Sequence, residues 1–423
     1  MIRVHDMPPI AEVSALASMV KLACIPLLSR RAVSVFLNTD ARSSLHYMPP
    51  LVMRLMSQCL EGYMHHLGGD VVYVTDFLDD HGGKEDTPTC RAVTTESKSY
   101  QILECGYAFL RLPDRRLVVK LMYRNFGNGE TISVVDVYSH EDSSDFVEGW
   151  EQYTRRHHYL LGRTAFADGE PIIQTRRYSW DDIVISNEAR SMLHLHVETF
   201  LASTSRLRAA GVSAKRGLIL AGPPGTGKTL LGKVLANTLG VTFLWVLPRH
   251  IKSPDCIVKL METARFVTPA VVFFEDLDLF GEDRETSQSA VLGELMNQLD
   301  GVSTNDHIIA IATTNRLDVI ERALRNRPGR FDRVVEIGLP DQPLRRKMLG
   351  KFLATADISE TDLVELARRT TGYSGAQLAE LVTTLHLLAG ERAGHRLAID
   401  KSLIDAAIAD MQVEERKPIG FGE

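Results

Sequence analysis

The most constraining feature of this 423-residue chain is a glycine-rich segment between a short apolar run and a helical pattern. The segment fits the pattern G-x-x-x-x-G-K-[ST], in which closely spaced glycines let backbone N–H groups surround a polyphosphate. Residues 217–221 are predicted to form a buried parallel strand, and residues 230–239 a helix whose N-terminus faces the anion. The segment consists of Gly222, Pro223, Pro224, Gly225, Thr226, Gly227, Lys228 and Thr229.

Two side chains of this phosphate loop have predicted tasks. We expect Lys228 to reach the β- and γ-phosphates and the Thr229 hydroxyl to bind Mg²⁺. An ordinary Gly/Pro turn is the alternative, and it is disfavoured because the whole pattern and both flanking elements agree. The sequence therefore predicts a site for a nucleoside triphosphate with Mg²⁺.

Polar residues follow two further apolar runs. Residues 271–274 are apolar and precede Glu275 and Asp276, while residues 308–312 form a second apolar run shortly before Asn315. Acids at the carboxyl end of a buried parallel strand suit the holding of Mg²⁺ and the polarisation of water beside the phosphates. We expect the Asn315 amide to orient the attacking water.

Composition narrows the class of protein. The chain is 44% hydrophobic and 24% charged, with a net charge of −6, which is ordinary for a soluble globular protein. Its length is sufficient for two or three domains, each with its own core. Lys and Arg form no run, so a nucleic-acid-binding function is disfavoured.

The cysteines and one apolar stretch indicate in which cellular compartment the protein is expected and whether it enters a membrane. The five cysteines show no C-x-x-C spacing and are expected to be reduced thiols of a cytosolic protein. Residues 15–28 are apolar except for Ser18, Lys21 and Pro26, so the stretch is too short and too interrupted for a spanning helix. A buried amphipathic helix is favoured there, with membrane anchoring as the alternative.

The region before residue 176 is predicted to be an α+β domain that binds a partner or substrate. It contains no catalytic constellation, and its paired histidines, including 157–158, lack acidic or cysteine partners at ligand spacing, so we interpret them as solvated. The predicted elements are helices over 10–37, 50–66 and 143–160, strands over 71–77, 100–110, 116–124 and 131–138, a hairpin loop over 125–129 and an exposed loop over 79–98.

Residues 178–412 resemble the AAA family of ATPases, in the branch with the extended second region of homology. The phosphate loop, the acidic strand and the Thr-Thr-Asn segment ending at Asn315 follow in the family's order, as do residues 327–333 (RPGRFDR) and the lid signature at 371–378 (TGYSGAQL). The resemblance implies a doubly wound parallel α/β sheet over 176–340, with a helical lid and tail over 341–423.

This resemblance also implies roles for individual residues, with ATP as the nucleotide. Asp182, Ile183 and Val184 would lie beside the adenine, Asn315 would be the first sensor, and Gly375 and Ala376 would bring the lid helix onto the nucleotide. Arg327 and Arg330 would project into a neighbouring subunit as arginine fingers, because guanidinium groups suit the developing γ-phosphate charge. Surface salt bridges are the alternative for these arginines. Fingers supplied in trans imply a homo-oligomeric ring, a hexamer by family resemblance.

Two features depart from the common family pattern. The acidic pair is inverted, so that by position Glu275 should hold the hydrated Mg²⁺ and the shorter Asp276 should polarise water, with slower hydrolysis as a consequence. Residues 248–254 stand where a pore loop is expected, yet they contain no aromatic residue and no glycine. In both respects the chain is similar to the mitochondrial AAA translocases that move a folded protein, and this resemblance is partial.

Two classes of function follow. The first is a ring that hydrolyses ATP to remodel, disassemble or translocate a protein partner, favoured by the sensor and the fingers. The second is a nucleotide-gated scaffold or switch with slow turnover, favoured by the abbreviated pore loop. A protease is disfavoured because no His-Glu-x-x-His occurs.

Overall fold

The computed structural model divides the chain into two units. One contains residues 1–175, 241–245 and 250–271, and the other contains residues 176–240, 246–249 and 272–423. The residues that the structure describes are 33–34, 36–38, 41–75, 89–125, 131–173, 176–212, 215–280, 285–300, 307–318, 320, 331, 333–390 and 398–415.

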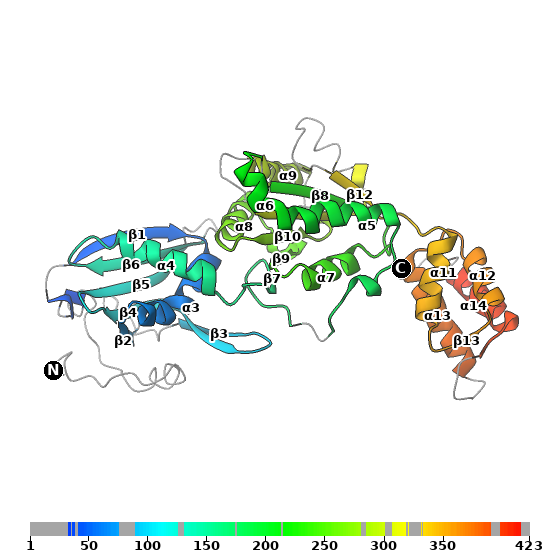
Figure 1. Cartoon of the computed structure of the whole chain (residues 1–423), viewed down its shortest axis with the longest axis horizontal. Helices are drawn as coiled ribbons and strands as arrows, with labels where there is room; N and C mark the ends of the chain where they lie inside the picture. The colour runs from blue at the N-terminus through cyan, green and yellow to red at the C-terminus, as the bar shows by residue number, and fades with distance from the viewer. Residues whose placement is uncertain are drawn as a thin grey trace, which may run out of the picture. The chain divides into compact units, whose positions relative to one another are not determined.

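An antiparallel sheet forms the main part of the first unit (Figure 1). Its strand order is β1-β6-β5-β4-β2, and β3 pairs with β4 outside this path. The hairpin predicted around 125–129 is confirmed, because Asn125 pairs with Thr131 across it. The strands are β1 (Arg42–Met48), β2 (Asp70–Thr75), β3 (Thr89–Thr94), β4 (Ser99–Arg111), β5 (Arg116–Asn125) and β6 (Thr131–Ser139).

Two helices, α3 (Pro50–His66) and α4 (Ser144–His157), accompany this sheet. They pack through aromatic side chains: the Trp150 indole N–H donates to the Met56 carbonyl oxygen at 2.8 Å, and the ring centroids of Tyr63 and Phe146 are 5.4 Å apart. The prediction of an α+β domain ahead of the ATPase region is therefore confirmed.

Three predictions for this region need correction. Strand β3 lies within the segment predicted as a loop over 79–98, and β1 was not predicted at all. Both are partly or wholly exposed, so neither shows a clear apolar alternation. His158 is buried, with 2% of its surface exposed, which overturns its interpretation as solvated. The predicted helix over 10–37 lies outside the described residues, apart from helical residues 33–34 and 36–37.

The second sheet has the order β12-β8-β11-β10-β9-β7 (Figure 1). Strand β8 pairs in parallel with β11 and β12, and β7 pairs in parallel with β9. Strands β9, β10 and β11 are wholly buried, as expected for apolar strands in a parallel sheet. The strands are β7 (Thr164–Phe166), β8 (Lys215–Ala221), β9 (Thr242–Val246), β10 (Ala270–Phe274), β11 (Ile308–Thr314) and β12 (Arg333–Glu336).

Helices connect these strands in the manner of a doubly wound fold. The helical segment from Asn187 to Ala209 contains a π-helical turn at His194–Thr199 between two α-helical parts. The predicted α/β fold class is confirmed. The helices are α5 (Asn187–Leu193), α6 (Phe200–Ala209), α7 (Lys228–Thr238), α8 (Pro254–Phe266) and α9 (Glu285–Asp300), preceded by the 3₁₀ turn η3 (Trp180–Asp182).

In the described part of the chain after residue 341, four helices form the lid, which is drawn in orange to red in Figure 1. They enclose a hydrophobic core to which Leu366, Leu378 and Ile404 belong. Val184 joins this core from the segment before α5. No helix in the described part of the chain is long and apolar enough to cross a membrane. The lid helices are α11 (Gln342–Phe352), α12 (Glu360–Arg369), α13 (Gly375–Gly390) and α14 (Lys401–Glu415).

Candidate nucleotide-binding site

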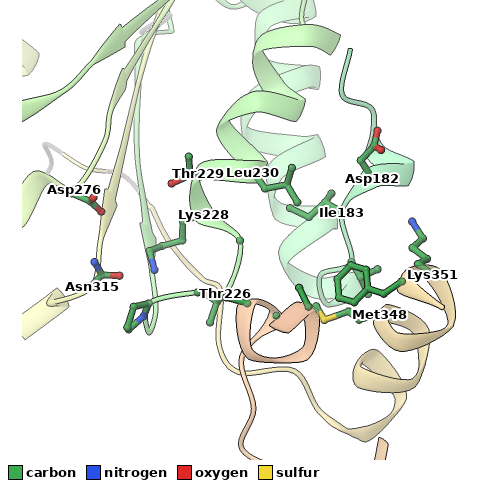
Figure 2. Close-up of a pocket in the computed structure, with 18 residues that line it drawn as sticks. Asp182, Ile183, Thr226, Lys228, Thr229, Leu230, Asp276, Asn315, Met348 and Lys351 are labelled. Atoms are coloured by element: carbon green, nitrogen blue, oxygen red, sulfur yellow. The ribbon is translucent and has the colours of Figure 1, made fainter. Parts of the chain in front are cut away.

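A pocket of about 510 Å³ lies where β8, β10 and β11 end and α7 begins. Asp276 and Asn315 lie at one end of it near Lys228, and Asp182, Ile183 and Lys351 lie at the other (Figure 2). Most residues predicted for the site line this pocket, namely Asp182, Ile183, Val184, Pro224, Gly225, Thr226, Gly227, Lys228, Thr229, Asp276, Asn315, Gly375 and Ala376.

The phosphate loop adopts a backbone that its glycines permit. Gly225 and Gly227 have φ angles of +74° and +100°, a region that residues with a side chain rarely adopt. Gly222 is required for a different reason: a Cβ added there would lie 2.0 Å from the Ile337 carbonyl oxygen. The loop is therefore shaped by glycines at its start, middle and end.

Lys228 is held in place by the loop itself. Its ammonium donates to the carbonyl oxygens of Gly222 and Pro223, both at 2.8 Å, and only 6% of the residue is exposed. Burial lowers the pKa of Lys228, and the carboxylates of Asp276 and Asp278 oppose that change. A buried cation at the start of a helix is a suitable partner for a phosphate group.

Thr229 and Glu275 bring two oxygen atoms together. The Thr229 hydroxyl donates to Glu275 Oε1 at 2.6 Å, and the Glu275 N–H donates to the Val246 carbonyl oxygen at 2.9 Å. Mg²⁺ prefers oxygen ligands, so this hydroxyl and carboxylate fit the predicted metal. Glu275 does not itself line the pocket, whereas Asp276 does.

The Asp276 carboxyl lies in an environment that disfavours its charge. Burial raises its pKa, the negative charges of Glu275 and Asp278 raise it further, and the Lys228 ammonium acts in the opposite direction. The backbone of Asp276 is left-handed, with φ +50° and ψ +60°. Asp276 thus has both a carboxylate whose charge is disfavoured and an unfavourable backbone conformation, and each of these features is typical of functional sites.

Asn315 follows β11 directly, and its position is fixed by a neighbouring acid. Its backbone N–H donates to Asp278 Oδ1 at 3.2 Å, and Asp278 is itself buried. The Asn315 side chain lines the pocket beside Asp276 (Figure 2). The amide is therefore available at the end of the pocket that also contains Lys228.

The other end of the pocket is formed by the segment before α5. The Asp182 carboxylate accepts from the Ser179 N–H at 2.8 Å and from its hydroxyl at 3.0 Å, and it pairs with Arg176. These interactions keep the pKa of Asp182 below its usual value. Asp182 therefore stabilises its own turn, while Ile183 and Val184 contribute apolar surface to the pocket.

The lid contacts the phosphate loop through the start of α13. The Ala376 N–H donates to the Gly225 carbonyl oxygen at 3.0 Å. Sequence reasoning missed five lining residues, because none belongs to a motif and four of them lie on α11 and α13, far along the chain from the loop. They are Leu230, Met348, Lys351, Phe352 and Ala379.

Some predicted residues lie elsewhere. Gly222 and Pro223 do not line the pocket, although both bind Lys228. Arg327 and Arg330 lie outside the described residues. The segment 248–254, where a pore loop was expected, contains a short 3₁₀ turn at Pro248–His250 followed by the start of α8.

Comparison with known proteins agrees with this geometry. The model of the family described as "ATPase family associated with various cellular activities (AAA)" matches residues 218–339. The ATP-dependent zinc metalloprotease FtsH 3 of Sphaerobacter thermophilus is 35% identical over 260 residues, which are 59% of this chain and 51% of that protein.

Two other relatives have a similar sequence identity to this chain. The ATPase family gene 2 protein of Saccharomyces cerevisiae is 35% identical over 224 residues, 50% of this chain and 29% of that protein. Protein SAV of Sulfolobus acidocaldarius is 34% identical over 245 residues, 55% of this chain and 31% of that protein. The chain thus spans about half or less of the length of these relatives.

Proposed function

Because the chain contains an AAA ATPase domain, we propose that it binds ATP with Mg²⁺ and hydrolyses it to ADP and phosphate. We propose that this reaction drives the remodelling, disassembly or translocation of a protein partner. The observation that supports this most directly is the pocket in which Lys228, Asp276 and Asn315 meet at the end of the phosphate loop. Relatives named as ATP-dependent enzymes and ATPases support the same class of reaction.

In this proposal each residue has one task. Lys228 and the backbone N–H groups of the phosphate loop bind the phosphates, and Thr229 and Glu275 hold Mg²⁺. When bound, Mg²⁺ would neutralise charge on the β- and γ-phosphate oxygens. Asp276 polarises the attacking water and Asn315 orients it. The adenine lies against the segment of Asp182, Ile183 and Val184 and is covered by the lid residues Gly375 and Ala376.

We further propose a homo-oligomeric ring, with six subunits by family resemblance. Arg327 and Arg330 of one subunit would complete the site of the next, since a guanidinium group is always charged and spreads over several phosphate oxygens. The unit before residue 176 would bind the protein partner, and a cytoplasmic location agrees with free cysteines.

A nucleotide-gated scaffold with slow turnover is the second candidate. One observation favours it: the segment 248–254 provides a 3₁₀ turn and no aromatic ring where a gripping loop was expected. A ring of this kind would assemble around its partner, and hydrolysis would only reset it.

The Asp276→Asn variant tests the hydrolytic role. Removing the base should preserve binding of ATP, because the phosphate loop is intact, and should lower kcat by at least about 100-fold. We would measure steady-state phosphate release and the Kd for a fluorescent ATP analogue, with Lys228→Ala as the variant expected to lose binding. Full turnover in Asp276→Asn would refute the assignment.

Assembly is tested by light scattering with and without an ATP analogue, alongside ATPase activity at rising protein concentration. A ring with fingers in trans should show specific activity that rises with concentration. A monomer with undiminished activity would contradict the ring, and a ring with almost no turnover would favour the scaffold.

A further inference from the structure

The segment that follows β10 and the end of β11 with the residue after it are joined by two crossed hydrogen bonds. The Asp276 N–H donates to the Thr313 hydroxyl oxygen at 2.8 Å, and the Asn315 N–H donates to Asp278 Oδ1 at 3.2 Å. Both acceptors are buried, with Thr313 exposed by 1%. Each segment therefore supplies one backbone donor and one side-chain acceptor to the other.

The first of these bonds is made by a residue with an unusual backbone. Asp276 has φ +50°, and in the described part of the chain only Asn38 and His307 share a positive φ without being glycine. Residues with side chains avoid this region, and they remain there only where their surroundings enforce it. The hydrogen bond from the Asp276 N–H to the Thr313 hydroxyl oxygen is a contact that can hold Asp276 in this conformation.

This backbone separates the tasks of two adjacent acids. The Glu275 carboxylate accepts from Thr229, whereas Asp276 lines the pocket (Figure 2). Consecutive side chains of an extended strand point to opposite faces. Strand β10 has ended before Asp276, and the left-handed backbone at Asp276 breaks this alternation. The direction of the shorter carboxylate thus depends on the turn at its own backbone.

We propose that Thr313 is a positioning residue for Asp276. Its hydroxyl oxygen accepts the Asp276 N–H and so maintains the left-handed turn that directs the carboxylate into the pocket. The inference rests on the proposed hydrolytic function and adds a residue that acts through Asp276. Serine keeps the acceptor oxygen, and valine keeps the shape without it.

The test compares Thr313→Val with Thr313→Ser. Because a misplacement of about 1 Å in a catalytic group can lower a rate about 100-fold, we expect Thr313→Val to lower kcat about 10- to 100-fold. The Kd for an ATP analogue should change by less than about threefold, since the phosphate loop is untouched. The Thr313→Ser variant should retain most of the kcat of the unchanged protein.

A control separates positioning from general loss of stability. Thr263 is also buried, and its hydroxyl donates to the Lys259 carbonyl oxygen at 2.8 Å in α8. Thr263→Val should lower the Tm by an amount similar to Thr313→Val and leave kcat unchanged. Equal kcat losses in the two variants, or an unchanged kcat in Thr313→Val, would overturn the inference.

A double-variant cycle tests the connection to Asp276. If Thr313 acts through that carboxylate, Thr313→Val should lower the residual single-turnover rate of Asp276→Asn by less than about twofold. A full additional loss would show that Thr313 acts by another route and would overturn the inference. Full turnover in Asp276→Asn alone would instead refute the proposed role of Asp276, which distinguishes the two failures.

Discussion

At the scale of the residue, available space decides which side chain the phosphate loop accepts. We expect Gly222→Ala to lower the free energy of unfolding by about 1–3 kcal/mol. The same variant should also bind ATP more weakly. The added methyl group would meet the Ile337 carbonyl oxygen at 2.0 Å, and a backbone atom cannot move aside as a flexible side chain does. Thermal unfolding and titration with an ATP analogue measure the two effects.

The matched control for this substitution is Gly338→Ala. No atom lies within 4 Å of a Cβ at Gly338. We therefore expect this variant to keep its Tm and its affinity for ATP. Similar losses in both variants would show that the close approach of Ile337 is not the cause.

His158 makes the stability of the first unit depend on pH. Burial lowers its pKa to about 4 from an ordinary value near 6.5, and the positive charge of Arg155 adds to this. Between these values the unfolded chain takes up a proton that the folded chain does not. Stability should therefore be complete above pH 6.5 and fall by about 3 kcal/mol as the pH is lowered to 4.

Urea unfolding between pH 7 and pH 5 measures this dependence. In the described part of the chain neither ring nitrogen of His158 has a hydrogen-bond partner, so a replacement by leucine leaves no acceptor or donor unsatisfied. His158→Leu should lose much of the slope. An unchanged slope would assign the effect to other groups.

At the scale of the element, helix caps connect the lid to the nucleotide site. The Ser374 hydroxyl accepts from the Gln377 N–H at 3.3 Å, and the Gln377 side chain accepts from the Ser374 N–H at 2.8 Å. Ala376, which donates to Gly225 in the phosphate loop, lies between the two residues of this capping box. Ser374→Ala should thus lower stability by about 1 kcal/mol and also weaken ATP binding several-fold.

Ser359 provides the control, because it caps α12, a lid helix none of whose residues lines the pocket. Its hydroxyl accepts from the Asp362 N–H at 3.0 Å. Ser359→Ala should lower the Tm by a similar amount with an unchanged Kd for the ATP analogue. Loss of affinity in both variants would mean that lid stability alone controls binding.

Elements with a strong pattern were predicted well, and the strands β1 and β3 were not. The fully buried strands β10 and β11 read as apolar runs, and their predicted ends differ from the observed ones by no more than two residues. Strand β1 is short, none of its residues is buried, and its Leu45 and Tyr47 side chains are exposed, so its sequence carries only a weak strand signal. Its strand conformation comes from pairing with β6, a contact distant in sequence.

At the scale of the whole molecule, the proposed fingers in trans predict that two inactive variants complement each other. Arg327→Ala should lower kcat by about 1,000-fold or more, and Lys228→Ala should abolish ATP binding. In a mixed ring, a site with its own Lys228 can face an intact Arg327 of the neighbouring subunit. Mixing the two proteins should therefore restore measurable ATPase activity.

A second mixture provides the negative control for this experiment. Mixing Arg327→Ala with a second variant of the same residue, Arg327→Lys, should restore little, because neither protein provides a guanidinium group at position 327. Absence of recovery in the first mixture, with rings present by light scattering, would contradict a finger in trans.

The sequence by itself determined the chemistry of the phosphate loop and the order, along the chain, of the segments that carry the acids and the amide. Glycines, a lysine and a hydroxyl at fixed spacing, with apolar runs on both sides, permit few other interpretations. This information is local, since each motif and its flanking strand lie within about 20 residues.

Only the tertiary structure decided how those motifs meet. It separated Glu275, which accepts from Thr229, from Asp276, which lines the pocket, and it joined Asp276 to Thr313. It also added Lys351 to the pocket wall. The physical reason is that such contacts depend on strand order and backbone angles, which unite residues that no spacing rule connects.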